Sequence, residues 1–146
     1  MDLEESSEPE WAARPPSAFD IATCYFPEVG KDSKQIPKLR PSLVLNVFQG
    51  KSDGRFACDV AFGTSRLKFH RRKGIDIIIQ NHTDIGMVGL SQATRFDLDH
   101  IIKLPWTREF FDCWSGFSSP IIGSLTEEYI KEYAFCMMQR QRDKND

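Results

Sequence analysis

The sequence predicts a mainly β domain with one C-terminal helix, arranged as a small barrel or sandwich. Short apolar segments rich in β-branched and aromatic residues recur between residues 19 and 104, most of them ending at Pro, Gly or Asn. A single helical apolar stripe follows near the C-terminus. The 146 residues suit one domain, and the 40% of apolar residues, including 11 Phe, suffice for one core.

The first 18 residues have the composition of a tail. They are rich in Glu, Ser and Pro, and Pro15–Pro16 cannot continue a helix. We therefore expect residues 1–18 to form an acidic, disordered tail and residues 19–142 to form the barrel domain. Trp11 is an unusual residue for such a tail and is a candidate for docking onto the domain.

Strands are expected wherever β-forming residues cluster between turn signals. The predicted strands are 19–26, 41–48, 56–62 and 75–80, with weaker candidates at 85–90, 94–98 and 101–104. Residues 27–39 form a long polar loop, and turns are expected at 51–54 and 81–84. The continuous apolar run within 41–48 indicates a strand that is buried on both faces.

Two helices are predicted after residue 105. Thr107 can cap a short one through residues 108–113. The longer helix begins at Ser124 or Thr126, because two glutamates follow and acidic side chains stabilise a helix N-terminus. Its apolar stripe extends to about residue 141.

The net charge of -2 conceals a strong asymmetry along the chain. Residues 31–73 carry eleven basic and three acidic side chains, a net charge of +8, whereas residues 1–30 carry -6 and residues 74–146 carry -4. A basic middle segment in an acidic protein indicates a local anionic ligand such as nucleic acid or phosphate. Ordinary solvated surface is the alternative interpretation.

Several functional classes leave no trace in the sequence. There is no phosphate-binding Walker loop, no nucleophile elbow and no dinucleotide fingerprint. No apolar run is long enough to span a bilayer, and the acidic N-terminus has no apolar signal region, so a cytoplasmic protein without membrane contact is expected. Metal-ligand spacing is absent among the histidines and cysteines, so no metal or cofactor is expected, and the scattered thiols are interpreted as buried and free: Cys24, Cys58, Cys113 and Cys136.

Two neighbouring strand motifs suggest a family. Arg40–Pro41 starts an apolar strand, and Val60–Thr64 ends the next one as Val-Ala-x-x-Thr. Both resemble strands of the MazF/PemK toxins of toxin–antitoxin systems, R-P-x-L-V and V-A-x-x-T. Three further segments are similar to that family in the same order, so that the resemblance spans residues 19–140: 19–27, 89–95 and 122–125.

The resemblance implies an SH3-like small barrel of the MazF/PemK/CcdB type, often a homodimer. It implies an endoribonuclease that cleaves single-stranded RNA without a metal and is inhibited by a cognate antitoxin protein. Such a reaction requires the ribose 2′-OH to lose a proton and attack phosphorus, the 5′-oxygen to gain a proton, and the phosphate charge to be stabilised by fixed donors.

The resemblance also assigns the catalytic residues. Arg40 matches the active-site arginine, whose rigid fork suits phosphate stabilisation better than proton abstraction. Thr64 matches the second catalytic position, where its hydroxyl and the neighbouring amides bind phosphate. The alternatives are that Arg40 pairs with a surface acid and that Thr64 is only a strand-end turn residue. The expected RNA-binding residues are Lys38, Ser65, Arg66, Lys68, Arg71 and Arg95.

Three aromatic residues are candidates for stacking on bases, although packing in the core is the favoured interpretation for Phe62, Phe69 and Phe96. Gly89 and Ser91 stand where some PemK-type proteins have an Arg and an Asp. The proton acceptor is thereby left open, with His70 and His82 as candidates. A non-catalytic RNA- or protein-binding module on the same barrel is the alternative function.

Overall fold

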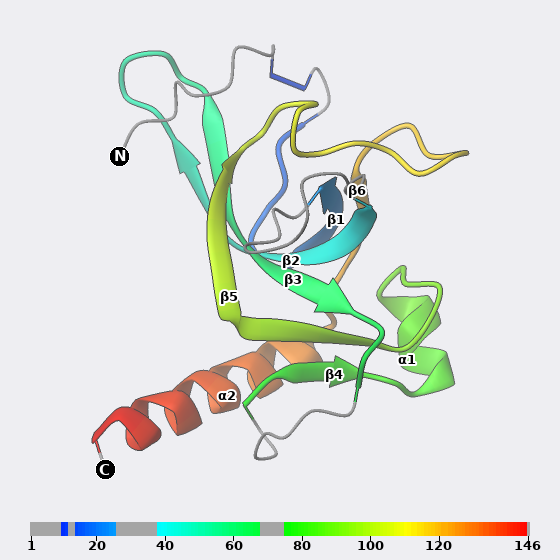
Figure 1. Ribbon diagram of the computed structural model, residues 1–146, viewed down its shortest axis with the longest axis vertical. Helices are drawn as coiled ribbons and strands as arrows, with labels where there is room; N and C mark the ends of the chain where they lie inside the picture. Colours follow the sequence, from blue (N-terminus) through cyan, green and yellow to red (C-terminus); the bar gives the residue numbers. More distant parts are fainter. Residues whose placement is uncertain (1–9, 12–13, 26–37, 68–74, 146) are drawn as a thin grey trace.

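The computed structural model describes residues 10–11, 14–25, 38–67 and 75–145. These residues form one curled, six-stranded antiparallel sheet, a half-barrel, with a C-terminal helix (Figure 1). The predicted mainly β class with a C-terminal helix is confirmed. The sheet has the order β4-β5-β3-β2-β1-β6. Its strands are β1 (Asp20–Tyr25), β2 (Leu39–Gln49), β3 (Phe56–Thr64), β4 (Ile77–Ile79), β5 (Thr94–Pro105) and β6 (Ile121–Ser124), and its helices are α1 (His82–Met87) and α2 (Glu127–Asn145).

The hairpin of β2 and β3 forms the centre of the sheet. Its turn lies at residues 51–53, close to the expected position, and is closed by the Gly50 N–H donating to the Arg55 carbonyl at 2.8 Å. The apolar run of β2 is buried on both faces, as predicted. Leu43 belongs to one core cluster and its neighbour Val44 to the other, because successive side chains of a strand point to opposite faces.

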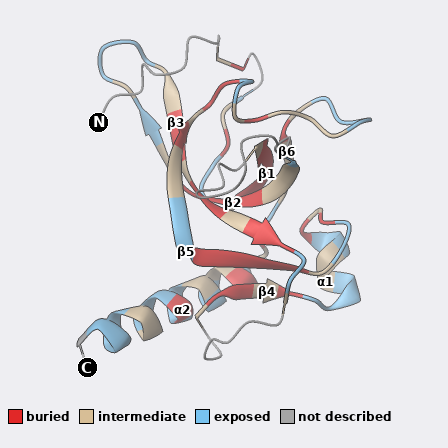
Figure 2. Cartoon of the chain, viewed as in Figure 1, coloured by how far each residue is buried: buried red, intermediate tan, exposed pale blue. Residues whose placement is uncertain are grey.

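The two core clusters lie on opposite faces of the sheet and make up much of the buried part of the chain (Figure 2). The first is formed between the sheet and α2, where Phe96 and Ile77 meet Tyr129 and Cys136. The second is aromatic, and Trp106 packs against Phe111 with ring centroids 4.8 Å apart.

The end of the predicted tail is part of this second cluster. Trp11 is 9% exposed, and its indole N–H donates to the Phe111 carbonyl at 2.8 Å. The Glu10 carboxylate accepts a hydrogen bond from the Phe56 N–H. The predicted disordered tail is therefore wrong for residues 10–11, because burial of the tryptophan stabilises their docking, and the domain extends N-terminal to residue 19. Residues 1–9 and 12–13 lie outside the described residues.

Helix α1 occupies a segment for which a turn and a strand were predicted. The Asn81 side chain caps the helix and accepts hydrogen bonds from the N–H groups of Thr83 and Asp84 at 2.9 and 3.3 Å. Asn is a favoured N-cap because its side-chain oxygen reaches these otherwise unpaired donors. The strand prediction for 85–90 is wrong, since Ile85 alone packs inward from this helix while Gly86 and Met87 are exposed.

The chain from residue 94 to residue 124 differs from the prediction in three respects. The two candidates 94–98 and 101–104 form one long strand, β5, which is interrupted by a bulge. The helix predicted for 108–113 is a turn that places Phe111 against Cys24 of β1. Strand β6, which was not predicted, pairs with β1.

The longer predicted helix is confirmed as α2. It begins with the two glutamates that favour a helix N-terminus and extends to residue 145, a few residues beyond the predicted end. Its buried side follows the sheet, whereas its C-terminal part extends beyond it (Figure 1). Within the described residues, neither helix combines the length and the apolar character needed to cross a bilayer.

Candidate functional site

Arg40 and Thr64 lie at the adjoining ends of β2 and β3. Ser42 pairs with Phe62 in the antiparallel register, and Arg40 and Thr64 lie two residues beyond this last pair, on the same side of the sheet. Residues directly opposite each other project from the same face of a sheet. The two strand ends approach closely here, since a Cβ added to Gly63 would lie 2.4 Å from the carbonyl oxygen of Pro41. The structure thus brings the two predicted catalytic positions together.

A polar face of the sheet is formed around these two residues. The opposite face at the same positions carries core residues such as Leu43, Ala61 and Phe96, which pack towards α2. We call the side that carries Arg40 the Arg40 face and define it by residues of β2, β3 and β5 that share one side of the sheet, of which Thr64, Arg95 and Asp97 are buried. Its members are Arg40, Phe62, Thr64, Arg95 and Asp97.

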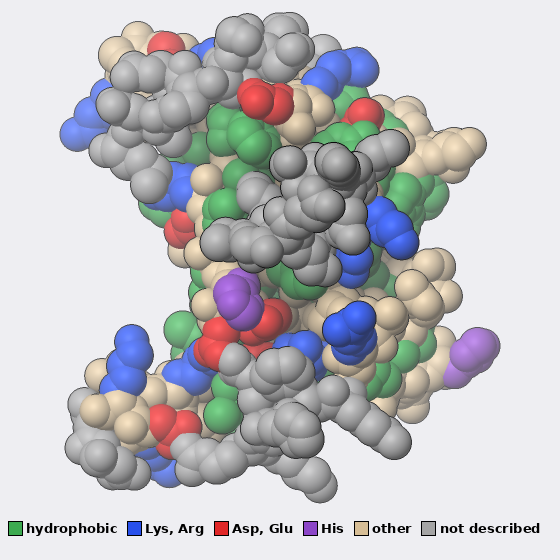
Figure 3. All heavy atoms as spheres, in the orientation of Figure 1, with side chains coloured by type: hydrophobic (Ala, Val, Ile, Leu, Met, Phe, Trp, Pro, Cys, Tyr) green, Lys and Arg blue, Asp and Glu red, His purple; other side chains and the backbone are tan. Residues whose placement is uncertain are grey.

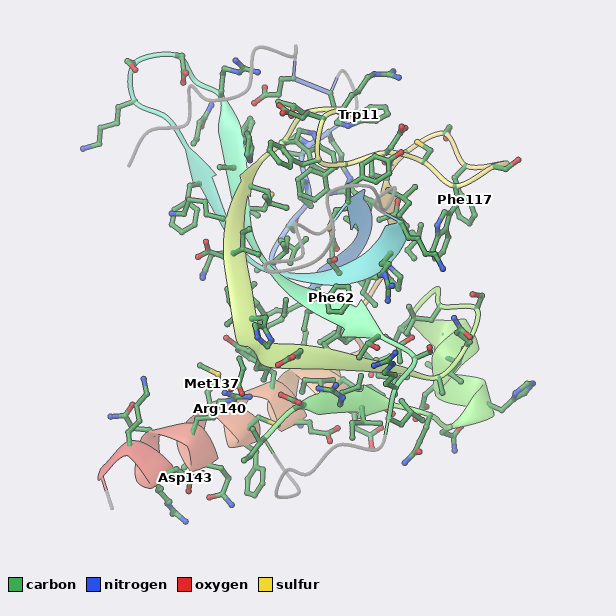
Figure 4. The ribbon with its side chains drawn as sticks, viewed as in Figure 1. Trp11, Phe62, Phe117, Met137, Arg140 and Asp143 are labelled. Atoms are coloured by element: carbon green, nitrogen blue, oxygen red, sulfur yellow. The ribbon has the colours of Figure 1, made fainter. Side chains whose placement is uncertain are left out.

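The Arg40 guanidinium lies against an aromatic ring. Its Cζ is 5.1 Å from the centroid of Phe62, and the Phe62 side chain lies in front of the sheet (Figure 4). This cation–π contact holds the Arg40 guanidinium at the Phe62 ring. A guanidinium held in one place suits a phosphate, because its planar fork matches two phosphate oxygens.

A groove of about 290 Å³ begins beside Arg40. It is lined by the start of β2, by the segment between α1 and β5, and by the loop that precedes β6. The lining residues are Lys38, Leu39, Arg40, Pro41, Ser65, Leu90, Ser91, Gln92, Thr94 and Trp114. Two cationic side chains, several hydroxyls and one indole in a single groove suit an anionic ligand that also carries an aromatic group.

The structure brings three of the predicted site residues into this groove: Lys38, Arg40 and Ser65. Trp114 is a groove residue that sequence reasoning missed. Its indole N–H donates to the Leu39 carbonyl at 3.2 Å, which holds the ring beside the start of β2. The only feature of the sequence that could have indicated this role is a tryptophan in a loop close to Gly116.

Thr64 contributes to the site in a different way from the one expected. It is 9% exposed and does not line the groove, and its hydroxyl oxygen accepts a hydrogen bond from the Arg66 N–H at 3.1 Å. This bond is typical of a residue that shapes a turn at the end of a strand. Thr64 therefore positions Ser65 and Arg66, both of which are exposed. In this arrangement the groove-lining hydroxyl at the strand end belongs to Ser65.

The prediction that Arg95 binds RNA is wrong. Its side chain is 6% exposed, and its guanidinium Nη1 lies 2.8 Å from Oδ2 of Asp76. Its Nε donates to the Arg66 carbonyl at 3.0 Å. Arg140 from α2 binds the other oxygen of Asp76, also at 2.8 Å. Arg95 is buried and neutralised because β5 lies in the interior of the sheet, and its role is to connect β5 to the strand on either side.

The remaining candidates have three different outcomes. Phe96 is fully buried in the first core cluster, which confirms the interpretation as core packing for that residue. Lys68, Phe69, His70 and Arg71 lie outside the described residues. His82 is exposed at the start of α1, and no groove-lining residue comes from that turn.

The cysteines are interior residues rather than nucleophiles. Cys24, Cys58 and Cys136 are buried, Cys113 is partly buried, and all four are free. Burial raises the pKa of the Cys24 and Cys58 thiols to about 12, so both are protonated at neutral pH. In the described part of the chain, no group of three or more His, Cys, Asp or Glu side chains is placed to hold a metal ion.

No protein-family model matches this chain, and no curated protein is similar to it in sequence. The resemblance to MazF/PemK toxins therefore stays a prediction, based on the motifs and on the geometry that they adopt.

Proposed function

We propose that this chain is a toxin-like endoribonuclease of the MazF/PemK type, with an SH3-like barrel that cleaves single-stranded RNA without a metal. The observation that supports this most directly is the position of Arg40, which lines the groove at the start of β2, beside the end of β3 that carries Thr64. The resemblance assigns catalytic roles to Arg40 and Thr64, which come from different strands of the sheet. The half-barrel shape of the sheet is compatible with such a fold.

In this proposal each groove residue has a distinct task. Arg40 stabilises the negative charge that accumulates on the phosphate as the 2′-oxygen attacks. Lys38 attracts the neighbouring backbone, and the Ser65 hydroxyl donates to a phosphate oxygen. Trp114 stacks on an unpaired base, which explains a preference for single strands, because bases within a duplex are already stacked.

The basic charge at the groove predicts that an acidic antitoxin and RNA compete for this surface. Residues 31–73 carry a net charge of +8, and Lys38 and Arg40 present part of it at the groove. An acidic antitoxin segment that folds on binding would cover this surface and exclude RNA. We propose that the protein acts in the cytoplasm as a homodimer and that it needs no cofactor for the reaction.

The proposal is tested by incubating the purified protein with a long single-stranded RNA in the presence of a chelator. Wild-type protein should cleave it, and Arg40→Ala should lower the rate by about 100-fold or more, as loss of a charge-stabilising donor does. Lys51→Ala is the matched control, because Lys51 is an exposed cation at the hairpin turn, away from the groove. It should cleave like the wild type. Intact RNA at high concentrations of wild-type protein would contradict the proposal.

A binding module without catalysis is the second candidate, and one observation favours it. A Cβ on Gly89 would lie 2.2 Å from the Ile122 carbonyl oxygen, and Gly89 has a φ of +87°. This position, at which some PemK-type proteins have an arginine, therefore accepts only glycine here. Binding of RNA that weakens with salt and yields no product would select this alternative.

A further inference from the structure

His100 contacts a carboxylate that is mostly shielded from water. Its Nδ1 lies 2.6 Å from Oδ2 of Asp97. The Asp97 side chain is 10% exposed, whereas that of His100 is 68% exposed. An ionised carboxylate accepts from the Nδ1–H group, and this bond selects the tautomer in which Nε2 is an acceptor. The imidazole thus presents a proton-accepting nitrogen towards solvent.

The carboxylate of this pair is itself held in place. The Asp97 Oδ1 accepts a hydrogen bond from the Asp99 N–H at 2.9 Å. Nη1 of Arg95 lies 3.9 Å from Oδ2. The Asp97 carboxylate is therefore held by a backbone N–H of its own strand and lies beside Arg95, which is itself fixed by Asp76.

A bulge in β5 creates the contact between the two side chains. Ala61 of β3 pairs with Ile101, but the next residue, Phe62, pairs with Asp97, so residues 98–100 have no partner on β3. In a regular strand, residues three apart are separated by about 10 Å and point to opposite faces. The bulge folds this segment back and brings His100 to Asp97. Bulges of this kind commonly redirect a side chain beside a functional site.

The pair lies on the same face of the sheet as Arg40. Asp97 is directly opposite Phe62, and Phe62 carries the Arg40 guanidinium. Three consecutive strands, β2, β3 and β5, therefore present in order a cation, an aromatic ring and a carboxylate–imidazole pair. Figure 3 shows a histidine beside acidic and basic side chains on the viewed face of the molecule. Neighbouring strands are about 4.8 Å apart, a spacing that a dinucleotide lying across them can bridge.

We propose that His100 is the general base of the RNA cleavage reaction and that Asp97 is its positioning residue. This inference rests on the proposed ribonuclease function and supplies the proton acceptor that Gly89 and Ser91 do not provide. In this arrangement Arg40 binds the scissile phosphate, and the nucleotide on its 5′ side lies over Phe62, so that the ribose 2′-OH points towards β5.

The proposed step is balanced without a metal or a redox partner. The O2′–H bond breaks and its proton moves to Nε2 of His100, while O2′ forms a bond to phosphorus. The P–O5′ bond breaks, and the leaving oxygen takes a proton from water. The products are a 2′,3′-cyclic phosphate and a 5′-hydroxyl. Asp97 stabilises the imidazolium, which then returns its proton to solvent.

The charged groups around His100 determine how the reaction depends on pH. They come from β5, from the residue before β4 and from α2. They are Asp97, Asp99, Arg95, Asp76 and Arg140. Both arginines are paired with acids, and the carboxylate in direct contact with the imidazole is that of Asp97. An imidazolium has no acceptor nitrogen, so general-base cleavage should be slower in acid.

The test compares three variants of the full chain with the wild type: His100→Gln, Asp97→Asn and, as the matched control, His82→Gln. His82 is the matched control because it lies on α1, whereas His100 lies on β5, next to the strands that carry Phe62 and Arg40. Initial cleavage rates are measured between pH 5 and pH 9 with a chelator and a short single-stranded RNA. Affinity is measured separately with the 2′-deoxy substrate, which cannot react, and folding is verified by circular dichroism.

We expect His100→Gln to lower the rate by about 100-fold or more, to change affinity less than about twofold, and to abolish the rise of rate with pH. Asp97→Asn should retain part of the rate, and nitrogen NMR should show that the His100 ring loses its preference for the Nδ1–H tautomer. His82→Gln should behave like the wild type.

The other outcomes overturn distinct claims. If the wild type cleaves and His100→Gln cleaves equally fast with the same pH profile, His100 is not the base, although the ribonuclease function stands. If His100→Gln loses affinity as much as rate, His100 is a binding residue and the proposed step is wrong. If the wild type does not cleave, the ribonuclease function fails and the proposed role of His100 fails with it.

Discussion

The Arg40 guanidinium lies over the Phe62 ring, with Cζ 5.1 Å from the ring centroid, and the two residues come from adjacent strands. A cation–π contact at such a site contributes about 0.5–2 kcal/mol, which corresponds to roughly 2- to 30-fold in rate if it orients the catalytic group. Phe62→Leu should therefore slow RNA cleavage by about tenfold, whereas Phe62→Tyr should retain most of it. Equal cleavage rates for the Phe62→Leu variant and the wild type would show that the ring does not orient Arg40.

The buried ion pairs around Asp76 predict a large effect on stability. Asp76 binds Arg95 and Arg140 at 2.8 Å each and is 4% exposed. Asp76→Asn removes the carboxylate closest to the buried Arg95 and one of the two acids that bind Arg140, so urea denaturation should show a loss of about 3 kcal/mol in the free energy of unfolding. The exposed pair of Glu127 and Lys131 provides the control, and Glu127→Gln should produce no measurable change.

Docking of the N-terminal segment predicts that Trp11 is a core residue. Truncation of a buried tryptophan typically costs about 3–5 kcal/mol, and Trp11→Ala also removes the hydrogen bond to the Phe111 carbonyl. The midpoint of urea unfolding should fall accordingly. Met87→Ala, at a position that is 65% exposed, should leave the midpoint unchanged. If Trp11→Ala is as stable as the Met87 variant, the segment does not dock in solution.

The close approach of β2 and β3 predicts that Gly63 cannot be replaced. Gly63→Ala would place a Cβ 2.4 Å from the Pro41 carbonyl oxygen, so the strand ends that hold Arg40 and Thr64 would have to separate. We expect both stability and cleavage to fall. Gly86→Ala is the control, because nothing lies within 4 Å of its Cβ and alanine favours a helix, so a gain of about 0.5–1 kcal/mol is expected. Wild-type cleavage by the Gly63 variant would contradict the strand-end geometry.

The buried thiols predict a loss of stability at alkaline pH. Burial raises the pKa of Cys58 from 9.0 to about 12, so the folded state disfavours the thiolate. The stabilisation from this shift is complete below pH 9, where the unfolded thiol is still protonated, and is lost as the pH rises towards 12. The stability difference between wild type and Cys58→Ala should therefore shrink across this range. A constant difference would indicate that the thiol is not buried in solution.

Local sequence patterns predicted the strands and the long helix correctly where the residues of an element by themselves favour its structure. The apolar run of β2 and the glutamates at the start of α2 are signals of this kind. The predictions were wrong where contacts between residues far apart in the sequence determine the local structure. The polar residues Asp99 and His100 made β5 look like two strands, because a sequence pattern does not distinguish a bulge from a strand end.

In the candidate site, too, local patterns indicated some residues, and contacts between distant residues determined the others. The motif resemblance identified Arg40 and Thr64, and the pairing of β2 with β3 places them at adjoining strand ends. The burial of Arg95 depends on Asp76, 19 residues away, and no local pattern indicates that pairing. The Asp97–His100 contact likewise exists only because of the bulge, whereas spacing in the sequence predicted no role for His100.

The most direct test of the central claim is mass spectrometry of the ends produced from a short single-stranded RNA in a chelator. The ribonuclease function predicts fragments with a 2′,3′-cyclic phosphate and a 5′-hydroxyl from wild-type protein. It also predicts no cleavage at a position where a single 2′-hydroxyl is removed. Intact RNA at the highest protein concentration, or fragments that carry 5′-phosphates, would contradict it.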